Sequence, residues 1–305
     1  MVPAYFYPST GSDWDRLTAA ASRVPLVAIM NPANGPGNSP TADPRYLRAI
    51  QSLQQAGGRV TGYVYTSYGK RSPQEVKADL RHYHELYPLD GFFLDEMAND
   101  GTSASVTYYA ELYDYIHRLK PSYHVTGNPG TRTREIYLSR PTVDTMVTFE
   151  DGTGYTPYVP EAWNARYPSH QFCHLLHSIT NAAGLTNAVS LAQKRNAGFL
   201  FVTDDVLPNP WDHLPTYWDA QIDLVEEANR AAAGSSPPRL DLKRREDGHG
   251  RLELDGPAGR YIIETAPVLT EWSLLTTNLT FTGQLAFEPI LWAQTARIFF
   301  RAGVE

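Results

Sequence analysis

The sequence is poor in cysteine and in positive charge. Its single cysteine, Cys173, excludes an intramolecular disulfide. Among 305 residues, 26 lysines and arginines are outnumbered by 33 acidic residues, so there is no basic excess for a nucleic acid or an anionic membrane. The sequence also shows no secretory signal and no apolar run long enough for a transmembrane helix. We therefore expect neither a nucleic acid nor a membrane among its partners.

A glycine-rich phosphate turn is also missing. Doubly wound dinucleotide-binding sheets carry such a turn after their first strand, whereas the corresponding segment here, "YPSTGSDW", has a single glycine. Short apolar runs typical of buried strands recur instead, with helical patterns between them. Eight such units in roughly 230 residues predict a (β/α)8 TIM barrel, and an open doubly wound sheet is the alternative. The runs span residues 2–8, 24–32, 59–67, 89–96, 123–129, 143–150, 170–178 and 197–205.

Several intervening segments carry helix start and stop signals. In "SPQEVKADL", Ser72, Pro73 and Glu75 form the pattern of a capping box with proline at the first helical position. The segment "SASVTYYAELYDYIHRLKP" stops at Pro121. Within the last helical segment, "WDHLPTYWDAQIDLVEEANRAAA", Pro215 predicts a break. These signals support helices that alternate with the strands.

The C-terminal part of the chain has a different pattern. Glycine, serine and proline in "GSSPPRL" predict a linker over residues 234–240, and short alternating runs follow without helix signals. We therefore predict a barrel domain over residues 1–233 and a small antiparallel β module over 241–305. Within the module, Trp272 and Trp292 are either core residues or a platform for a sugar.

Carboxylates follow the apolar strand bodies. Asp95 and Glu96 end the fourth run, and Glu150 ends the sixth. The eighth run ends in Asp204 and Asp205. Catalytic groups of a barrel sit at the C-terminal ends of its strands, so these acids would line one polar mouth. Two carboxylates that face one another across a cleft are the minimum apparatus for glycoside hydrolysis. The alternative is that they cap helices or bind loop amides.

The segment "HQFCHLLH" gathers candidate metal ligands. Alternation along a strand would put His170 and His174 on one face. Cys173 and His177 would lie on the other face, so the four side chains cannot close around a zinc ion. We therefore expect no metal and no cofactor, and we keep His174 as a residue that contacts substrate.

The strand-end motifs, taken in order, resemble those of a known family. "VPAYFYPS", "MNPANGPG", "GYVYTSYG", "GFFLDEM", "GNPG" and "FED" follow one another within residues 2–230, an order similar to that of the spherulin-4 family of glycoside hydrolases. The resemblance implies a (β/α)8 enzyme that cleaves α-1,4-linked N-acetylgalactosamine in galactosaminogalactan, a biofilm exopolysaccharide. It also implies that the essential acids are an Asp-Glu pair at the fourth strand and a Glu at the sixth, which match Asp95, Glu96 and Glu150.

We accordingly predict an endo-acting glycoside hydrolase with a retaining mechanism. By analogy with other retaining barrels, Asp95 is the nucleophile, Glu150 the acid/base and Glu96 a supporting group. Asp95 and Glu150 lie two strands apart, and backbones about 9–10 Å apart let inward-leaning carboxylates approach to about 5–5.5 Å. Other residues at the strand ends are expected to bind the sugar, namely Tyr7, Asn31, Tyr65, Asn128, His174 and Asp204.

Two alternatives stay open at this point. The barrel could bind carbohydrate without turning it over, or it could hydrolyse a different amino sugar, such as galactosamine, because a pocket for an acetyl group depends on loop geometry. The family implies secretion, which a single cysteine permits. We expect a secreted monomer whose partner is a polysaccharide.

Overall fold

The computed structural model describes residues 1–235 and, beyond them, the strand segments 239–244, 250–255, 259–266, 273–280, 284–290 and 299–304. Internal contacts divide the chain into two compact units, Met1–Leu224 and Val225–Glu305. Within the described residues, no helix combines the length and the apolar character that crossing a bilayer requires.

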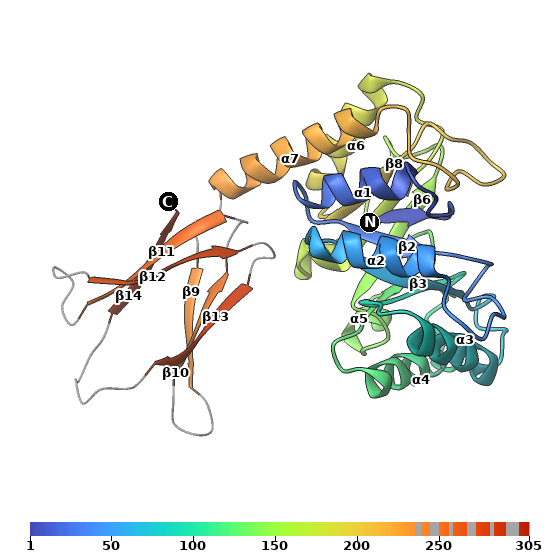
Figure 1. The fold of residues 1–305 in the computed structure, drawn as a ribbon, viewed down its shortest axis with the longest axis horizontal. Helices are drawn as coiled ribbons and strands as arrows, with labels where there is room; N and C mark the ends of the chain where they lie inside the picture. The colour runs from blue at the N-terminus through green and yellow to red at the C-terminus, as the bar shows by residue number, and fades with distance from the viewer. Residues whose placement is uncertain are drawn as a thin grey trace. The chain divides into compact units, whose positions relative to one another are not determined.

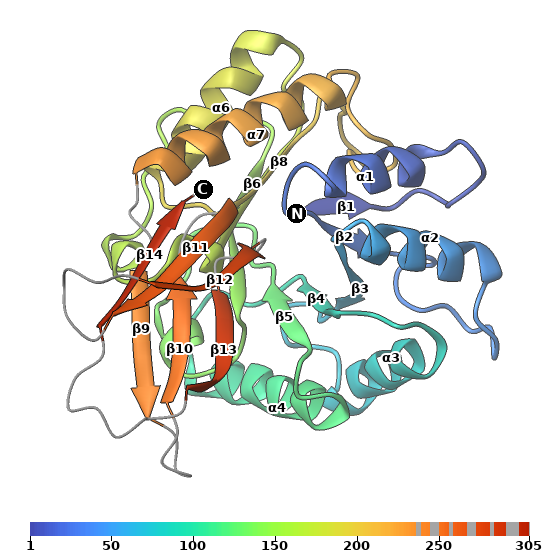
Figure 2. The ribbon, with the colours of Figure 1, turned by 60° about the vertical axis from the view of Figure 1, so that its left-hand side comes forward.

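The first unit is built on eight parallel strands in sequential order (Figures 1 and 2). A doubly wound sheet would reverse its strand order at a switch point, so this order confirms the predicted (β/α)8 barrel. The barrel is nearly closed: strand pairing runs from β1 to β8, and at the seam the Tyr5 amide donates to the Trp211 carbonyl at 3.2 Å. The strands are β1 (Val2–Ala4), β2 (Val27–Met30), β3 (Arg59–Tyr65), β4 (Gly91–Asp95), β5 (His124–Gly127), β6 (Thr145–Asp151), β7 (Phe172–Leu176) and β8 (Phe199–Val202).

Helices follow the strands and surround the barrel (Figure 2). The predicted capping box is confirmed by reciprocal hydrogen bonds between Ser72 and Glu75. One prediction is wrong: Pro215 does not break a helix, because the last helix begins after it, where the Trp218 amide donates to the Pro215 carbonyl. The helices are α1 (Asp13–Ala21), α2 (Pro44–Gln55), α3 (Pro73–Leu86), α4 (Ser103–Leu119), α5 (Ile136–Ser139), α6 (Ala182–Lys194) and α7 (Trp218–Ser235), and two short 3-10 helices, η1 (Ala162–Arg166) and η2 (Ser169–Gln171), precede β7.

Alternation along β4 separates the inside of the barrel from its outside. Phe92 is fully buried against the helix layer, where its ring meets Tyr83 of α3. Phe93 and Asp95 point the other way, and the Phe93 ring stacks on Tyr63 of β3 with 6.4 Å between centroids. The apolar run in "GFFLDE" therefore packs both layers before it ends in a carboxylate.

Strand β6 carries one extra residue relative to β7. Between Val147 and Phe149 the pairing with β7 advances by a single residue, so Thr148 forms a bulge. A one-residue shift moves every later side chain to the opposite face of a sheet. As a result, Val147 and Glu150 point to the same side of the sheet, which strict alternation would not allow.

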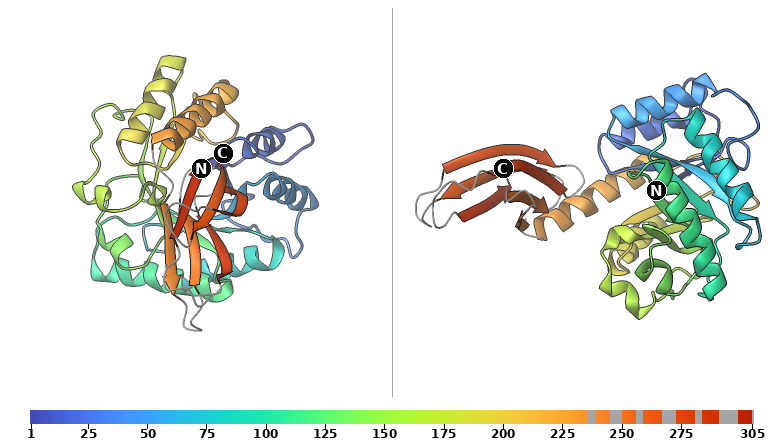
Figure 3. Two further views of the ribbon diagram at one scale, coloured as in Figure 1. Left: turned by 90° about the vertical axis from the view of Figure 1, so that its left-hand side faces the viewer. Right: turned by 90° about the horizontal axis from the view of Figure 1, so that it is seen from below.

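The second unit contains two three-stranded antiparallel sheets, drawn in orange and red in Figure 3. This confirms the predicted antiparallel β module. Helix α7 continues to Ser235 and β9 begins at Arg239, so both elements enter the segment predicted as a linker, 234–240. Trp272 and Trp292 lie outside the described residues. The sheets have the orders β13-β10-β9 and β12-β11-β14, with β9 (Arg239–Arg244), β10 (Gly250–Asp255), β11 (Gly259–Ala266), β12 (Ser273–Thr280), β13 (Gln284–Ile290) and β14 (Phe299–Val304).

Candidate active site

Asp95, the last residue of β4, is held by two side-chain donors. The Tyr63 hydroxyl donates to Asp95 Oδ2 at 2.8 Å, and the Asn128 amide nitrogen donates to Oδ1 at 2.7 Å. Tyr63 reaches Asp95 because both lie on the inner face of adjacent parallel strands, two positions apart in register. Burial raises the pKa of the Asp95 carboxyl, while these two donors and the Glu96 backbone amide oppose the rise.

Glu150 of β6 faces the same space. The bulge at Thr148 turns it inward, and its Oε2 accepts a hydrogen bond of 2.6 Å from the Asn128 amide nitrogen. The same nitrogen donates to Asp95 at 2.7 Å, so Asp95 Oδ1 and Glu150 Oε2 lie at most 5.3 Å apart. Burial, followed by the charge of Asp95, raises the pKa of Glu150 to about 7. This carboxylate pair, Asp95 and Glu150, therefore contains one group that keeps its proton near neutral pH.

A short segment at the end of β5 fixes both acids. Backbone hydrogen bonds of 2.8 and 2.9 Å join Asn128 to β4 and the turn after it, on either side of Asp95. Two residues further on, the Gly130 carbonyl accepts the Glu150 amide at 2.9 Å. Gly130 has a φ of 66°, a left-handed conformation that glycine adopts readily. The motif "GNPG" thus sets the spacing of the pair through the backbone as well as through the side chain.

Glu96 does not continue strand β4. Its φ of 50° is left-handed, and its carbonyl accepts hydrogen bonds from the Tyr68 amide at 2.7 Å and the Thr66 hydroxyl at 2.8 Å. The Glu96 carboxylate is half-buried, and it makes no hydrogen bond or ion pair within the part of the chain that the structure describes. It is therefore available to a ligand at the mouth.

Two predicted sugar-binding residues lie at the pair. Asn128 joins the two carboxylates, as described above. Tyr65 is the register partner of Asp95 on β3 and is half-buried. The Arg71 guanidinium lies 4.1 Å from the centre of the Tyr65 ring and is itself paired with Asp79 at 2.8 Å. The ring of Tyr65 is therefore held in place beside the mouth.

Three further predicted residues make hydrogen bonds within the βα loops instead. Tyr7 donates to Asp43 at 2.7 Å, and Asn31 accepts a loop amide at 2.9 Å. Asp204 accepts another loop amide at 3.1 Å and a threonine hydroxyl. The structure does not join these three side chains to the carboxylate pair.

His174 lies on the helix side of β7, away from the pair. Leu175 is the register partner of inward-facing Glu150, so the adjacent His174 points outward. It is fully buried and shares a hydrogen bond of 2.8 Å with the Tyr155 hydroxyl. Burial, and then the charge of Arg195, lower its pKa to about 3, so it stays neutral. We therefore interpret His174 as a core residue and not as a sugar ligand.

Two tyrosines near the pair were not predicted from the sequence. Tyr63 donates to Asp95, and the half-buried ring of Tyr5 meets the Tyr63 ring edge-on at 5.4 Å. Burial, together with the charges of Asp95 and Glu150, raises the pKa of Tyr5. Alternation in "GYVYTS" could have identified Tyr63, because it shares a strand face with Tyr65.

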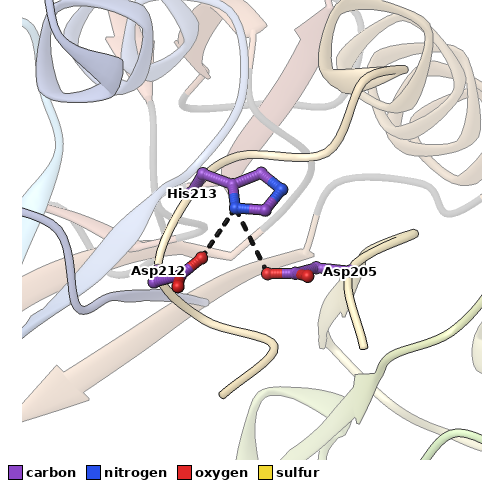
Figure 4. A group of neighbouring side chains, drawn as sticks. All are labelled: Asp205, Asp212 and His213. Atoms are coloured by element: carbon purple, nitrogen blue, oxygen red, sulfur yellow. Dashed lines mark hydrogen bonds and ion pairs between the residues drawn. The ribbon is translucent and has the colours of Figure 1, made fainter. Parts of the chain in front are cut away.

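A cluster after β8 brings together possible metal ligands (Figure 4). His213 Nδ1 lies 2.7 Å from Asp212 Oδ1 and 3.2 Å from Asp205 Oδ2, and the three ligand atoms are within 4.8 Å of one another. The hydrogen bond to Asp212 is the main cause of a raised pKa at His213. The two carboxylates favour the protonated imidazole, which cannot bind a metal, so ion pairs account for these contacts.

Exposed apolar side chains gather on the side of the mouth. Among the side chains that the structure describes, each large apolar residue that is exposed lies in a loop after a strand or at the first residue of the helix that follows. Loops of this kind form the C-terminal face of a barrel. Such a rim can contact the apolar faces of sugars. Its members are Tyr7, Tyr68, Ile136, Val159, Val206 and Leu207.

The sequence of the first unit is similar to those of known proteins. The model of spherulation-specific family 4 matches residues 1–225. Spherulin-4 from Physarum polycephalum is 33% identical over 216 residues, which cover 67% of this chain and 62% of that protein. The match therefore leaves more than a third of that relative's length uncovered.

Solved structures of other proteins are also similar to this chain. The crystal structure of Aspergillus clavatus Sph3 in complex with GalNAc has a TM-score of 0.64 and 27% identity, covering 74% of this chain and 96% of that one. α-L-Fucosidase isoenzyme 2 from Paenibacillus thiaminolyticus has a TM-score of 0.50 at 13% identity, covering 76% and 49%. At that identity the likeness concerns the fold alone, which is a barrel like those of glycoside hydrolases.

Proposed function

The chain belongs to spherulation-specific family 4, and from this premise we propose that it is an endo-acting glycoside hydrolase that cleaves α-1,4-linked N-acetylgalactosamine, or galactosamine, in an exopolysaccharide. A related structure holds GalNAc. The candidate site in the same barrel consists of two carboxylates, the groups that this reaction needs. Such a substrate is extracellular, so we also propose that the protein acts as a secreted monomer.

One observation carries the proposal: Asp95 Oδ1 and Glu150 Oε2 lie at most 5.3 Å apart. Retaining glycosidases hold their carboxyl groups about 5–5.5 Å apart, whereas inverting enzymes leave about 6.5–9.5 Å for a water molecule. The spacing in this site supports the retaining arrangement. It leaves too little room for a water between the two groups.

The two carboxyl groups divide the first step. Asp95 accepts hydrogen bonds on both oxygens, which favours its ionised form, and it attacks the anomeric carbon as the nucleophile. Glu150, whose pKa is raised to about 7, donates its proton to the glycosidic oxygen. The bond between the anomeric carbon and that oxygen breaks, and the leaving sugar departs as an alcohol.

The second step returns the enzyme to its starting state. Glu150, now a carboxylate, takes a proton from water while the water oxygen attacks the anomeric carbon. The ester bond to Asp95 breaks, so Asp95 leaves as a carboxylate and Glu150 is protonated again. Two displacements retain the anomeric configuration. Glu96, the residue after Asp95, has a carboxylate without a partner among the described residues, and it binds a hydroxyl or amine of the sugar.

The proposal is tested by product release from purified polysaccharides of known composition. We expect oligosaccharides from α-1,4-linked N-acetylgalactosamine or galactosamine polymers, with the retained anomer formed first by NMR. Parallel assays on acetylated and de-acetylated polymer separate the two amino sugars, and Glu150→Gln serves as the inactive control. Binding of the polymers without product release would contradict hydrolysis and leave a non-catalytic carbohydrate-binding barrel.

A further inference from the structure

Asn128 joins the carboxylate pair through one nitrogen. A carboxamide nitrogen carries two hydrogens, and here each carboxylate receives a bond from it, at 2.7 Å for Asp95 and 2.6 Å for Glu150. Both distances are shorter than the usual 2.9–3.0 Å or so of neutral hydrogen bonds from nitrogen, as expected where the acceptor is a carboxylate. Asn128 is only 7% exposed, so water does not compete for these bonds.

The other end of the same amide has no partner. Asn128 Oδ1 is buried and accepts no hydrogen bond within the part of the chain that is described. A buried carbonyl without a donor destabilises a fold, so such a group calls for an explanation. Rotating the amide by half a turn would place this oxygen against two carboxylates, which is worse. The carboxylate pair therefore determines the orientation of the Asn128 amide, which leaves Oδ1 without a hydrogen-bond donor among the described residues.

Asp95 and Glu150 accept different numbers of hydrogen bonds from side chains. Both oxygens of Asp95 accept a side-chain donor, Oδ2 from Tyr63 and Oδ1 from Asn128. Glu150 accepts a side-chain donor only at Oε2, and Oε1 has none among the described contacts. A protonated carboxyl oxygen is a weaker acceptor than an unprotonated one, so the hydrogen bond from Asn128 favours Oε2 as the oxygen without the proton. The proton is then favoured on Oε1.

We propose that Asn128 is a positioning residue that divides the roles of the two carboxylates: by holding Asp95 Oδ1 and Glu150 Oε2 as acceptors, it fixes their separation and places the transferable proton on Glu150 Oε1. This inference rests on the proposed function. Asp95 is thereby kept as the ionised nucleophile, and Oε1 of Glu150 is the atom that meets the glycosidic oxygen. Asn128 is then not only a sugar ligand at the end of β5, as its sequence position suggests.

Among the titratable groups around Glu150, Asp95 is the one whose charge raises the pKa of Glu150. Burial raises the pKa of Tyr63 and Tyr5, and the pKa of the Cys173 thiol rises to about 12, so these three stay neutral at ordinary pH. The hydrogen bond from Asn128 lowers the pKa of both carboxyls against the effect of burial. Removing this donor should therefore move both titrations to higher pH together.

The test replaces Asn128 and measures ionisation as well as rate. In Asn128→Ala, both limbs of the pH–rate profile should shift to higher pH, and kcat should fall on the order of 100-fold because the acids lose their fixed geometry. The matched control is Asn181→Ala, which removes the helix cap of α6 at Gly184 and touches neither acid. The control should leave both limbs in place.

A substrate-free measurement separates this inference from the proposed activity. The ionisation of the Glu150 carboxyl, followed by 13C NMR and assigned with Glu150→Gln, should titrate at higher pH in Asn128→Ala than in the unmodified protein. If that variant melts at assay temperature, Asn128→Asp keeps the volume, lacks the donors and should shift the titration in the same direction. An unmoved Glu150 titration in a folded variant would overturn the inference, whatever the activity proves to be.

Discussion

Carboxylates flank the same two strands at both ends of the barrel. At the mouth, Asp95 ends β4 and Glu150 is the second-last residue of β6, and the two share a donor and lie within 5.3 Å of each other. At the base, Asp90 precedes β4 and accepts the Val60 amide at 2.8 Å. Asp144 precedes β6 and accepts the amide at the start of β5, also at 2.8 Å.

The carboxylates at the two ends of the barrel differ in whether they share their hydrogen-bond donors. Each base carboxylate binds the backbone of the neighbouring strand and also a side-chain donor, Gln54 for Asp90 and Tyr113 for Asp144. The base also borders a cavity of about 490 Å³ whose walls include the cationic side chains of Arg59 and Lys120. At the mouth, two acids divide one amide, and both pKa values are raised. The base carboxylates stabilise strand register, whereas at the mouth the charge of Asp95 helps to keep the proton on Glu150.

The test with the largest expected effect replaces one aspartate at each end of the barrel with asparagine, in separate variants. Asp95→Asn should lower turnover on the order of 10⁴-fold or more, because the nucleophile is lost, while oligosaccharide binding by calorimetry persists. Asp90→Asn, five residues earlier and just before the same strand, should keep turnover within about twofold. A near-normal rate for Asp95→Asn would remove it as nucleophile and leave Glu96 as the residue to examine.

Glu150 predicts a pH effect on both rate and stability. Activity requires its protonated form, so the rate should fall as pH rises through about 7, and Glu150→Gln should lose this limb along with most of its activity on substrates with poor leaving groups. Because the folded pKa lies above the unfolded one, the folded state binds more protons between pH 4.5 and about 7.

The stability contribution of Glu150 is therefore lost as pH rises through that window. Glu150→Gln should be more resistant to heat than the unmodified protein at pH 8, with the advantage shrinking towards pH 5. Thermal melts across this range check the sign. A variant that is less stable at pH 8 would show that Glu150 supports the fold in the way that the base carboxylates do.

The base should show the opposite behaviour. Asp144→Ala leaves the Val125 amide and the Tyr113 hydroxyl without their acceptor, so the free energy of unfolding should fall by about 1–3 kcal/mol. Activity per folded molecule should not change. Urea unfolding with a parallel activity assay checks both statements. A loss of rate without a loss of stability would contradict the purely structural role of Asp144.

Tyr68 offers a smaller effect at the mouth. The residue is 60% exposed, and its amide donates to the Glu96 carbonyl at 2.7 Å, which ties the loop after β3 to the residue that follows Asp95. Loss of stacking in Tyr68→Ala should raise KM on the long polymer by up to about tenfold and leave kcat nearly unchanged. Tyr68→Phe should retain the unmodified KM. Tyr115→Ala, on the outer helix α4, is the control, and equal effects of the two alanine variants would reject a platform at Tyr68.

The smallest expected effect is that of chelation. Ion pairs account for the contacts of His213 with Asp205 and Asp212, so we expect that exhaustive treatment with EDTA does not change the rate. His213→Ala should likewise remain active. Activity that is lost on chelation and restored by a divalent ion would mean that this cluster, or the mouth itself, holds a metal.

Much of the barrel and part of the site follow from local signals. Repeated buried runs, capped helices and acids at strand ends predict the fold, Asp95 and Glu150, because these features depend on composition over a few residues. The direction of a side chain depends on where a strand starts and whether its register is regular. His174 was expected to contact substrate from the seventh apolar run, but it is the middle residue of β7, and pairing with β6 shows that it points outward. Asn128 bonds across to two other strands, which the sequence around it cannot show.

The bulge at Thr148 can be lost in two ways, and they have opposite consequences for Glu150. If Thr148 entered the regular ladder, Phe149 would pair with Leu175 on the inside and Glu150 would turn towards the helix layer. If Thr148 were deleted, Phe149 would stay opposite His174 and Glu150 opposite Leu175, on the inside. A one-residue gap at this point of an alignment would therefore leave the acid of the proposed site in place. An unchanged sequence that pairs in the regular register would not.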